Sequence, residues 1–275
     1  MINPKLEQSV MKALLWLCIV LSTAVLVLIL WNVLSHGIPV LNTTFFTESP
    51  RAMGREGGIY STIVSTLYLV VLALAIAAPL GVGAAVFLVQ YKKQDALLSV
   101  IRFATESLAG IPSVIFGIFG FTFFVIYLKM GWSILSGGLT LALMIFPIIV
   151  RTSEEAIKAV PDSVREASMA LGATRWQTTS LIVLPSALPG ILTGIVLSIG
   201  RAVGESAAVL LTAGSALGVP LSLLDPGRSM SVHLYVLATE GISMERAYAT
   251  GSVLVIVVML VNLLANSLTA KRKPL

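Results

Sequence analysis

Long stretches without a single charged residue are the strongest constraint in this sequence. Residues 13–34 form the first of them, which is longer than the roughly 7 to 15 apolar residues of a secretory signal. A helix needs about 20 apolar residues to cross the roughly 30 Å hydrocarbon core of a bilayer, so this segment is predicted to be an uncleaved membrane anchor. Five further apolar runs are long enough to be membrane spans: residues 61–89, 109–128, 133–150, 187–214 and 247–268.

The composition agrees with a chain that lies mostly in lipid. Hydrophobic residues make up 57% of the 275 residues and charged residues 11%, whereas soluble domains average about 45–50% apolar and about 25% charged. The single cysteine, Cys18, lies inside an apolar run and has no partner for a disulfide or a metal cage. These features argue against a disulfide-rich secreted protein, a disordered chain and a typical soluble enzyme. They favour an all-α polytopic membrane protein with six transmembrane helices.

The distribution of lysine and arginine predicts the orientation of the chain. Six spans place both termini on the same side of the membrane. The segments on that side contain twelve basic residues: Lys5, Lys12, Lys92, Lys93, Arg102, Arg151, Lys158, Arg165, Arg175, Lys271, Arg272 and Lys273. The segments on the other side contain five: Arg51, Arg55, Lys129, Arg228 and Arg246. Because basic residues are enriched in cytoplasmic loops, we expect both termini to be cytoplasmic, and the pI of about 9.5 needs no nucleic acid as an explanation.

A cation near the middle of the fifth predicted span needs an explanation of its own. Arg201 would cost about 2.5–3.5 kcal/mol at that depth unless it has a polar path or a partner. Glu205 follows one helical turn later and is the candidate partner. In one interpretation the two residues form a buried pair that only orients the helix. In the other, Arg201 faces a translocation pathway, because the planar fork of a guanidinium suits phosphate or carboxylate.

The third predicted span begins at a weak point. Gly110 and Pro112 stand at its start, so we expect a bendable helix there. Glu106 lies just before this point and is predicted to pair with Arg102, one turn earlier, at the membrane interface.

The predicted cytoplasmic stretch of residues 151–186 shows clear helix starts and stops. Ser163 and Glu166 have the spacing of a capping box, in which each side chain satisfies a backbone N–H of the other. A helix is therefore expected over residues 164–171. Gly172 follows and is expected to leave the helix through a left-handed turn.

A second helix is predicted directly after that turn. Thr174 and Gln177 repeat the capping pattern, and the helix should run from there toward Pro185. The product would be a bent pair of short amphipathic helices between two membrane spans, which suits a docking knob. A DNA-binding helix-turn-helix is the competing interpretation, but this pair would lie against the bilayer and lacks a basic recognition face.

The same stretch resembles a known motif. Glu166-Ala167-Ser168, followed after three residues by Gly172 and after nine more by Ile182-Val183-Leu184-Pro185, is similar to the EAA signature of bacterial ATP-driven (ABC) importer permeases. The one departure is Ser168 in place of the second alanine. The resemblance implies a MetI-like type-1 ABC permease core over residues 58–268. Residues 1–57, with one extra N-terminal helix, would precede this core, and a basic cytoplasmic tail, residues 269–275, would follow it.

In that family the motif forms a coupling helix, which sits in a groove on a separate ATPase subunit and transmits its closure to the spans. The resemblance implies this coupling role for Glu166, Ala167, Ser168, Gly172, Thr174, Trp176, Leu184 and Pro185. The sequence has no Gly-x4-Gly-Lys-Ser/Thr phosphate loop. ATP and its Mg²⁺ are therefore expected on the partner, and this chain is expected to bind no cofactor and to be no enzyme itself.

Two further segments resemble the phosphate-specific branch of these permeases. They are residues 108–120 and Gly200-Arg201-Ala202-Val203-Gly204-Glu205-Ser206-Ala207. The second segment places the charged intramembrane positions of the family on Arg201 and Glu205. Residues 57–63 and the short N-terminus are more similar to the PstA type than to the PstC type.

The resemblance implies a phosphate permease subunit in the bacterial cytoplasmic (inner) membrane that works by alternating access. Its expected partners are a homologous permease of the PstC type, two copies of an ATPase of the PstB type, and an external phosphate-binding protein of the PstS type. Membrane lipid, and no nucleic acid, is expected around it.

Other functions remain open at this point. The chain could be the PstC-type subunit, or an ABC permease for another anion such as sulfate or molybdate. It could also be an autonomous secondary carrier or channel in which Arg201 and Glu205 form a relay, although no internal repeat supports that class. An enzyme is not supported, because His36 and His233 are isolated and are predicted to be polar residues of external loops.

Overall fold

The computed structural model describes residues 4–91 and 96–270 of the chain. In these two segments all regular structure is helical, apart from an isolated bridge between Arg51 and Glu56. Five helices are long and apolar enough to cross a membrane, and a sharply bent pair of helices provides a sixth candidate span. The expectation of an all-α membrane protein with six spans is therefore confirmed.

The candidate spans follow the predicted apolar runs in order. They are α1 (Pro4–Gly37), α3 (Tyr60–Val86), the pair α4 (Ala96–Gly110) and α5 (Ser113–Gly120), α6 (Ile134–Lys158), α9 (Leu184–Gly204) and α12 (Met244–Ala270). Shorter helices connect them: α2 (Thr43–Thr47), α7 (Asp162–Ala170), α8 (Arg175–Thr178), α10 (Ala207–Thr212) and α11 (Met230–Thr239). Of the predicted cytoplasmic cations, those that lie outside the described residues are Lys92, Lys93, Lys271, Arg272 and Lys273.

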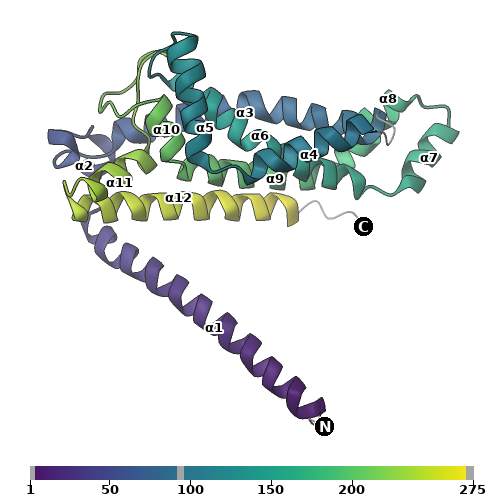
Figure 1. Ribbon diagram of the computed structural model, residues 1–275, viewed down its shortest axis with the longest axis horizontal. Coiled ribbons are helices and arrows are strands. Elements are labelled where there is room, and N and C mark those ends of the chain that lie inside the picture. Colours follow the sequence, from purple (N-terminus) through teal and green to yellow (C-terminus); the bar gives the residue numbers. More distant parts are fainter. Residues whose placement is uncertain (1–3, 92–95, 271–275) are drawn as a thin grey trace.

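The hydrophobic core lies between α3, α6 and α9, which run side by side along the molecule together with α12 (Figure 1). Leu69 of α3 and Leu141 and Ile149 of α6 are at most 1% exposed. Gly81 lets the two helices approach closely, because a Cβ there would lie only 2.8 Å from Cγ2 of Ile149. Small residues at a helix interface provide this kind of packing in lipid.

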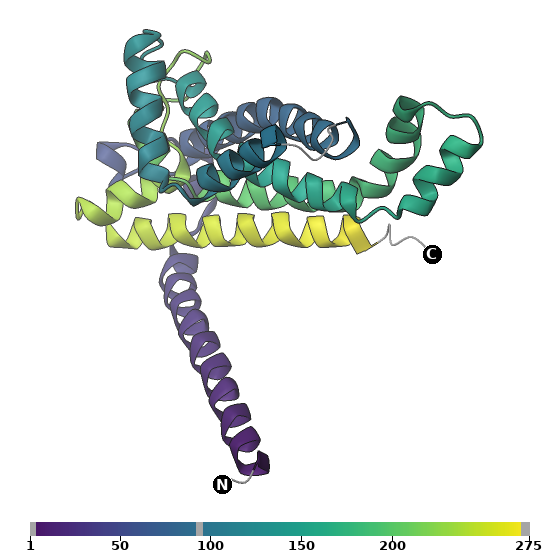
Figure 2. The ribbon, with the colours of Figure 1, turned by 45° about the vertical axis from the view of Figure 1, so that its right-hand side comes forward.

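The first span diverges from the others. α1 touches the bundle only near its C-terminal end, where the Ser252 hydroxyl of α12 donates to the Val33 carbonyl oxygen at 3.0 Å (Figures 1 and 2). None of its apolar window is buried inside the chain. Its Leu, Val and Ile side chains are therefore available to lipid, which solvates them well.

The third span is broken rather than continuous. The segment from Ser99 to Gly110 and the segment from Ser113 to Tyr127, which comprises α5 and a π-helical stretch (Phe121–Tyr127), meet at an angle of 100°. Pro112 explains the break, since it has no N–H and disfavours helical geometry in the residue before it. The bendable start was predicted at this point. The prediction of one uninterrupted span over residues 109–128 was wrong. α4, which contains the charged residues Arg102 and Glu106, forms the first half of the bent pair, and α5 begins the second half.

The fifth span is broken near its C-terminal end, and it begins earlier in the chain than predicted. α9 ends at Gly204, Glu205 is extended with ψ 123°, and α10 follows as a separate short helix. At the other end, α8, a π-helical stretch (Thr179–Val183) and α9 form one helix of 30 residues, Arg175–Gly204. The second short helix of the predicted pair is therefore not separate but the start of span five. The π-helical stretch lies just before Pro185, where a regular α-helix would clash with the proline ring.

The two ends of the bundle carry different elements. α7 and α8 project from one end, toward which α12 runs (Figures 1 and 2). α2, α11 and the 3₁₀ turns Ile38–Val40 and Ala52–Gly54 lie at the opposite end. This separation agrees with the loops that the six-span prediction assigns to opposite sides of the membrane.

We predict that Gly120→Ala destabilises the protein. A Cβ at Gly120 would collide with the Thr140 hydroxyl and lie 2.8 Å from Cγ2 of buried Thr212. Overpacking of this kind costs about 1–3 kcal/mol, so the thermal unfolding midpoint in detergent should fall by roughly 2–10 °C. Gly83→Ala is the matched control, because no atom lies within 4 Å of its added Cβ. Equal losses in the two variants would contradict the packing described here.

Candidate translocation and coupling sites

Arg201 lies in the last turn of α9 and points away from its own chain. Its side chain is exposed, whereas Ala202 and Val203 beside it are 3% and 5% exposed and pack in the core. The sequence had placed Arg201 near the middle of its span, whereas the structure places it near the end of α9. A guanidinium that faces lipid costs up to about 2.5–3.5 kcal/mol, the value for the centre of a span. The face of the chain that contains Arg201 therefore requires either water or another protein surface.

Glu205 does not pair with Arg201, contrary to one of the two interpretations of the sequence. Among the described residues, no ion pair joins them, because the backbone leaves the helix between them and the four-residue spacing no longer brings their side chains together. Instead, the Glu205 carboxylate accepts a hydrogen bond from the Ala208 N–H at 3.1 Å and so caps α10. The Glu205 carbonyl oxygen accepts from the Ser231 hydroxyl of α11 at 2.6 Å. Glu205 thus fixes the break in the span.

The two broken spans pack against each other close to this point. α10 lies against α5, and a Cβ on Gly117 of α5 would lie only 2.9 Å from the Cα of Ala208. Non-helical backbone at membrane depth is tolerated only where protein buries it or where it lines a cavity. Pro112 is exposed and Glu205 is half-buried, so by this rule we expect both breaks to meet another protein surface or water, and not lipid, in the assembled transporter.

The predicted coupling segment forms a helix with a different start. α7 begins at Asp162 with Pro161 as its N-cap, and no side chain caps it. The capping box predicted for Ser163 and Glu166 is therefore wrong, because Pro161, with ψ 140°, already provides the extended residue that precedes a helix. Arg165 binds Asp162 in the first turn and donates to the Ile157 carbonyl oxygen at 2.6 Å. It thereby ties α7 to the end of α6.

The turn after α7 agrees with the prediction. Gly172 has φ +88°, and the N–H of Ala173 donates to the Ser168 carbonyl oxygen at 3.3 Å. Thr174 and Gln177 form the predicted capping box, with bonds of 3.3 and 2.8 Å. Left-handed backbone at Gly172 and the reciprocal cap together fix the angle between α7 and α8.

Ser168 has a contact that the sequence did not reveal. Its side chain is 5% exposed and its hydroxyl lies 2.9 Å from that of buried Thr178 in α8. Where the EAA signature has alanine, this chain therefore has a hydrogen bond between the two limbs of the knob. A serine-threonine pair ten residues apart carries no sequence signal by itself, which is why it was not predicted.

The knob formed by α7, α8 and the turn between them presents apolar side chains to its surroundings. Leu171 is 90% exposed and Trp176 63%, and Leu181, in the π-helical stretch that follows α8, is 72% exposed. Glu166, Ala167 and Pro185 are also exposed, while Leu184 is half-buried. Exposed apolar groups gathered at one end of a molecule are typical of a surface that contacts another protein.

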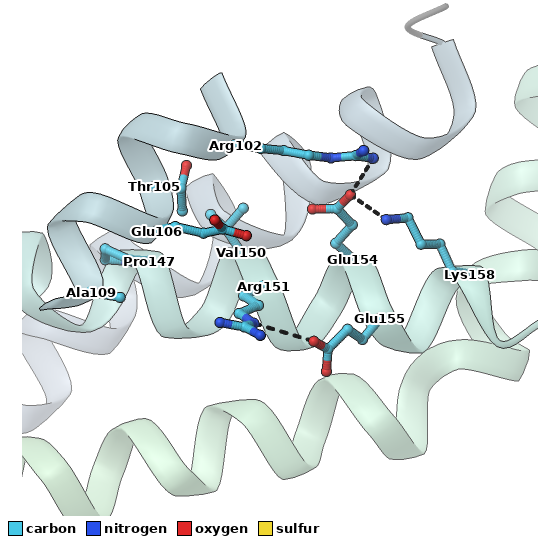
Figure 3. A pocket seen from close by; sticks show the side chains of 10 residues that line it. All are labelled: Arg102, Thr105, Glu106, Ala109, Pro147, Val150, Arg151, Glu154, Glu155 and Lys158. Atoms are coloured by element: carbon cyan, nitrogen blue, oxygen red, sulfur yellow. Dashed lines mark hydrogen bonds and ion pairs between the residues drawn. The ribbon is translucent and has the colours of Figure 1, made fainter. Parts of the chain in front are cut away.

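A charged cavity of about 250 Å³ lies between α4 and α6 (Figure 3). Glu154 stands between two cations, 2.6 Å from Arg102 and 2.7 Å from Lys158. The predicted pair of Arg102 with Glu106 is therefore wrong, because α4 packs on α6 and brings Arg102 to a carboxylate remote in sequence. Arg151 pairs with Glu155 at 3.3 Å on the same helix, and sequence reasoning missed all of these contacts.

His233 is buried rather than a polar residue of a loop, as was predicted. Its ring, in α11, is 1% exposed, and its Nδ1 lies 3.5 Å from a guanidinium nitrogen of Arg228, which is itself 3% exposed. Burial, together with the charges of Arg228 and Arg246, lowers the pKa of His233 to about 4. Arg228 also donates to the Ser215 carbonyl oxygen at 2.9 Å. The neutral imidazole is thus a structural element that joins the connecting segments at this end of the bundle.

The chain belongs to a family of membrane transport components. Residues 77–271 match the family model described as the binding-protein-dependent transport system inner membrane component. Together with the helical bundle, this match defines an ABC transporter permease subunit.

Curated relatives extend over almost the whole chain. It is 34% identical over 280 residues to the probable ABC transporter permease protein YqgI of Bacillus subtilis. The matched region covers 96% of this chain and 95% of the relative. It is 35% identical over 268 residues to the phosphate transport system permease protein PstA 1 of Mycobacterium tuberculosis, with 95% of this chain and 88% of the relative covered. PstA of Pasteurella multocida is 31% identical over 266 residues, with 95% and 94% covered.

Solved structures share the fold. A bacterial alginate ABC transporter, in complex with an alginate-bound periplasmic protein, matches with a TM-score of 0.70 at 17% identity, covering 96% of each chain. The MetNI methionine ABC transporter in an inward-facing conformation matches with a TM-score of 0.62 at 20% identity, covering 78% of this chain and 94% of that one. The expected MetI-like permease fold is therefore confirmed.

We predict that Gly172→Val loosens the knob. A β-branched residue in the left-handed region is strained by about 1–2 kcal/mol, so the turn should open roughly tenfold more often. Limited trypsin digestion should then cut after exposed Arg175 several-fold faster than in the unmodified protein. Gly172→Asn is the control, since asparagine tolerates this conformation and should preserve the slow rate. If valine and asparagine gave the same cleavage rate, the backbone of Gly172 would not fix the knob.

Proposed function

We propose that this chain is a permease subunit of an ATP-driven importer that moves inorganic phosphate across the bacterial cytoplasmic membrane. The family match supports the class, and several PstA relatives that cover most of the chain support phosphate as the cargo. The observation on which the proposal depends most is Arg201, a permanently charged guanidinium on a face of span five that its own chain leaves uncovered.

The surroundings of Arg201 favour an anion as its partner. Glu205, the nearest candidate counter-charge in sequence, is engaged in capping α10. Among the described residues, no carboxylate forms an ion pair with Arg201. A guanidinium binds the oxygens of phosphate through paired, charge-assisted hydrogen bonds, so a transient contact with phosphate at this depth is chemically apt. The contact has to stay weak, since a site that retains its ion blocks transport.

A second permease would cover the exposed face. A homologous subunit of the PstC type would place its own fifth span opposite Arg201, and the pathway would lie between the two. Two ATPase subunits of the PstB type, which bind ATP and Mg²⁺, would contact the knobs. An external binding protein of the PstS type would deliver phosphate to the opposite end, where α2 and α11 lie.

The knob would transmit force directly to Arg201. α8 and α9 belong to one helix of 30 residues, with Arg175 at the knob and Arg201 near the far end. Closure of the ATPase pair on α7 and α8 would therefore be transmitted to Arg201 along this helix, which includes the π-helical stretch Thr179–Val183 and Pro189. Glu166, Ala167 and Trp176 are exposed and would meet the ATPase, whereas buried Ser168 would hold the knob together.

The orientation follows from charge. The end of α6 and the knob together contain Arg151, Lys158, Arg165 and Arg175, and the positive-inside rule assigns such segments to the cytoplasm. Both termini would share that side. The alternatives are a PstC-type role or another anion, since fold neighbours import methionine or alginate and do not define the cargo. An autonomous carrier is a different class, in which transport would proceed without ATP.

We predict that Arg201→Gln abolishes ATP-dependent phosphate uptake by the reconstituted importer while the complex still assembles. Glutamine keeps a polar side chain but removes the charge. The rate of ATP-dependent phosphate uptake should therefore fall by a factor of about ten or more. Arg151→Gln is the matched control, because that exposed pair with Glu155 contributes little and uptake should continue. Unchanged uptake by Arg201→Gln would exclude Arg201 from the pathway.

A further inference from the structure

A second cavity lies at the base of the knob, away from Arg201. It measures about 230 Å³ and is formed where the π-helical stretch Phe87–Tyr91, which extends α3, meets α7 and α8. The described residues that line it are Gln90, Arg165, Met169, Arg175 and Thr178. No carboxylate is among these five. Arg165 is ion-paired with Asp162 outside the lining, so the positive character of the cavity comes from Arg175, which has no ion pair among the described residues.

The cavity contains hydrogen-bond donors that lack acceptors. The Nε2 atom of Gln90 and the Nε atom of Arg165 are buried, and neither has a partner. The other nitrogens of Arg165 are already engaged by Asp162 and by the Ile157 carbonyl oxygen. The Thr178 hydroxyl is paired with Ser168. Because a buried donor without a partner is unfavourable, these atoms and Arg175 call for a ligand that only accepts hydrogen bonds.

The position of the cavity relative to the spans narrows the choice of ligand. One candidate span ends at Gln90 and another begins at Arg175. Both helices are longer than the roughly 20 residues that cross the hydrocarbon, so we expect their ends at Gln90 and Arg175 to extend beyond it, into or past the layer of lipid headgroups. Arginine forks bind phosphate groups well, and basic pockets at this level are suited to anionic lipids.

We propose that Gln90, Arg165 and Arg175 bind a phosphate group, supplied either by an anionic lipid headgroup or by free phosphate. The bound group would join α7 to the ends of spans two and five. If α7 is the ATPase contact, as proposed above, occupancy of this site would stiffen the coupling element. The binding itself does not depend on that role.

The test uses the full-length tagged chain, purified in mild detergent with the subunits that accompany it and then delipidated. Phosphatidylglycerol, phosphatidylcholine or inorganic phosphate is titrated, and the temperature at which the tagged chain aggregates is measured. All variants contain Arg201→Gln, so that phosphate bound in the pathway does not contribute. Arg175→Gln is compared with Arg175→Lys and with Arg151→Gln, which removes a cation outside the cavity.

Phosphatidylglycerol should raise the aggregation temperature, and Arg175→Gln should require about tenfold more lipid for the same rise. Arg175→Lys should recover part of the response, and Arg151→Gln all of it. A response to inorganic phosphate with the same variant pattern, in place of the lipid response, would identify free phosphate as the source. Equal responses of all variants, or no response to either ligand, would overturn the proposal. Loss of ATPase co-purification in Arg175→Gln with an unchanged ligand response would also overturn it, because Arg175 would then be an ATPase contact.

Discussion

The need to satisfy every backbone polar group inside the hydrocarbon governs this structure. Six apolar segments meet that need as helices, and the two exceptions are informative. Span three bends by 100° at Pro112, and span five is interrupted at Glu205. The segments beside the two breaks pack together, since α5 lies against α10, and the Glu205 carboxylate caps α10 through the Ala208 N–H. The break at Glu205 directly follows the helical turn that contains exposed Arg201.

A single continuous helix connects this part of the membrane domain to the knob. Its first residue, Arg175, follows the capping threonine at the turn after α7, and its last turn contains Arg201. The angle of the knob is fixed by left-handed Gly172, by the Thr174–Gln177 box and by the buried contact of Ser168 with Thr178. In the proposed function, a displacement of the knob would therefore be transmitted along this helix to Arg201.

Features with a local origin could be predicted from the sequence, whereas features that depend on packing could not. The apolar runs predicted the membrane spans. Gly172, which tolerates a positive φ, and the capping residue Thr174 predicted the turn of the knob. The pairing of Arg102 was predicted wrongly because Arg102 pairs with Glu154, which is close only in the folded structure, and not with Glu106, which is close in sequence. The pairing of Glu205 was predicted wrongly because it assumed an unbroken helix. His233 was misassigned because the burial of a short connecting helix leaves no trace in local sequence, and the role of Arg201 remains a prediction.

The most direct test of this account is the accessibility of position 201 to water in the assembled complex. In a Cys18→Ser background, Arg201→Cys would be treated in membrane vesicles with a hydrophilic thiol reagent. Trp176→Cys on the exposed knob serves as the reactive reference and Leu28→Cys, 65% exposed on the apolar α1, as the lipid-facing one. The account predicts that Arg201→Cys reacts at a rate comparable to Trp176→Cys. A cysteine at position 201 that stays as inert as Leu28→Cys would contradict the claim that this face lines an aqueous pathway.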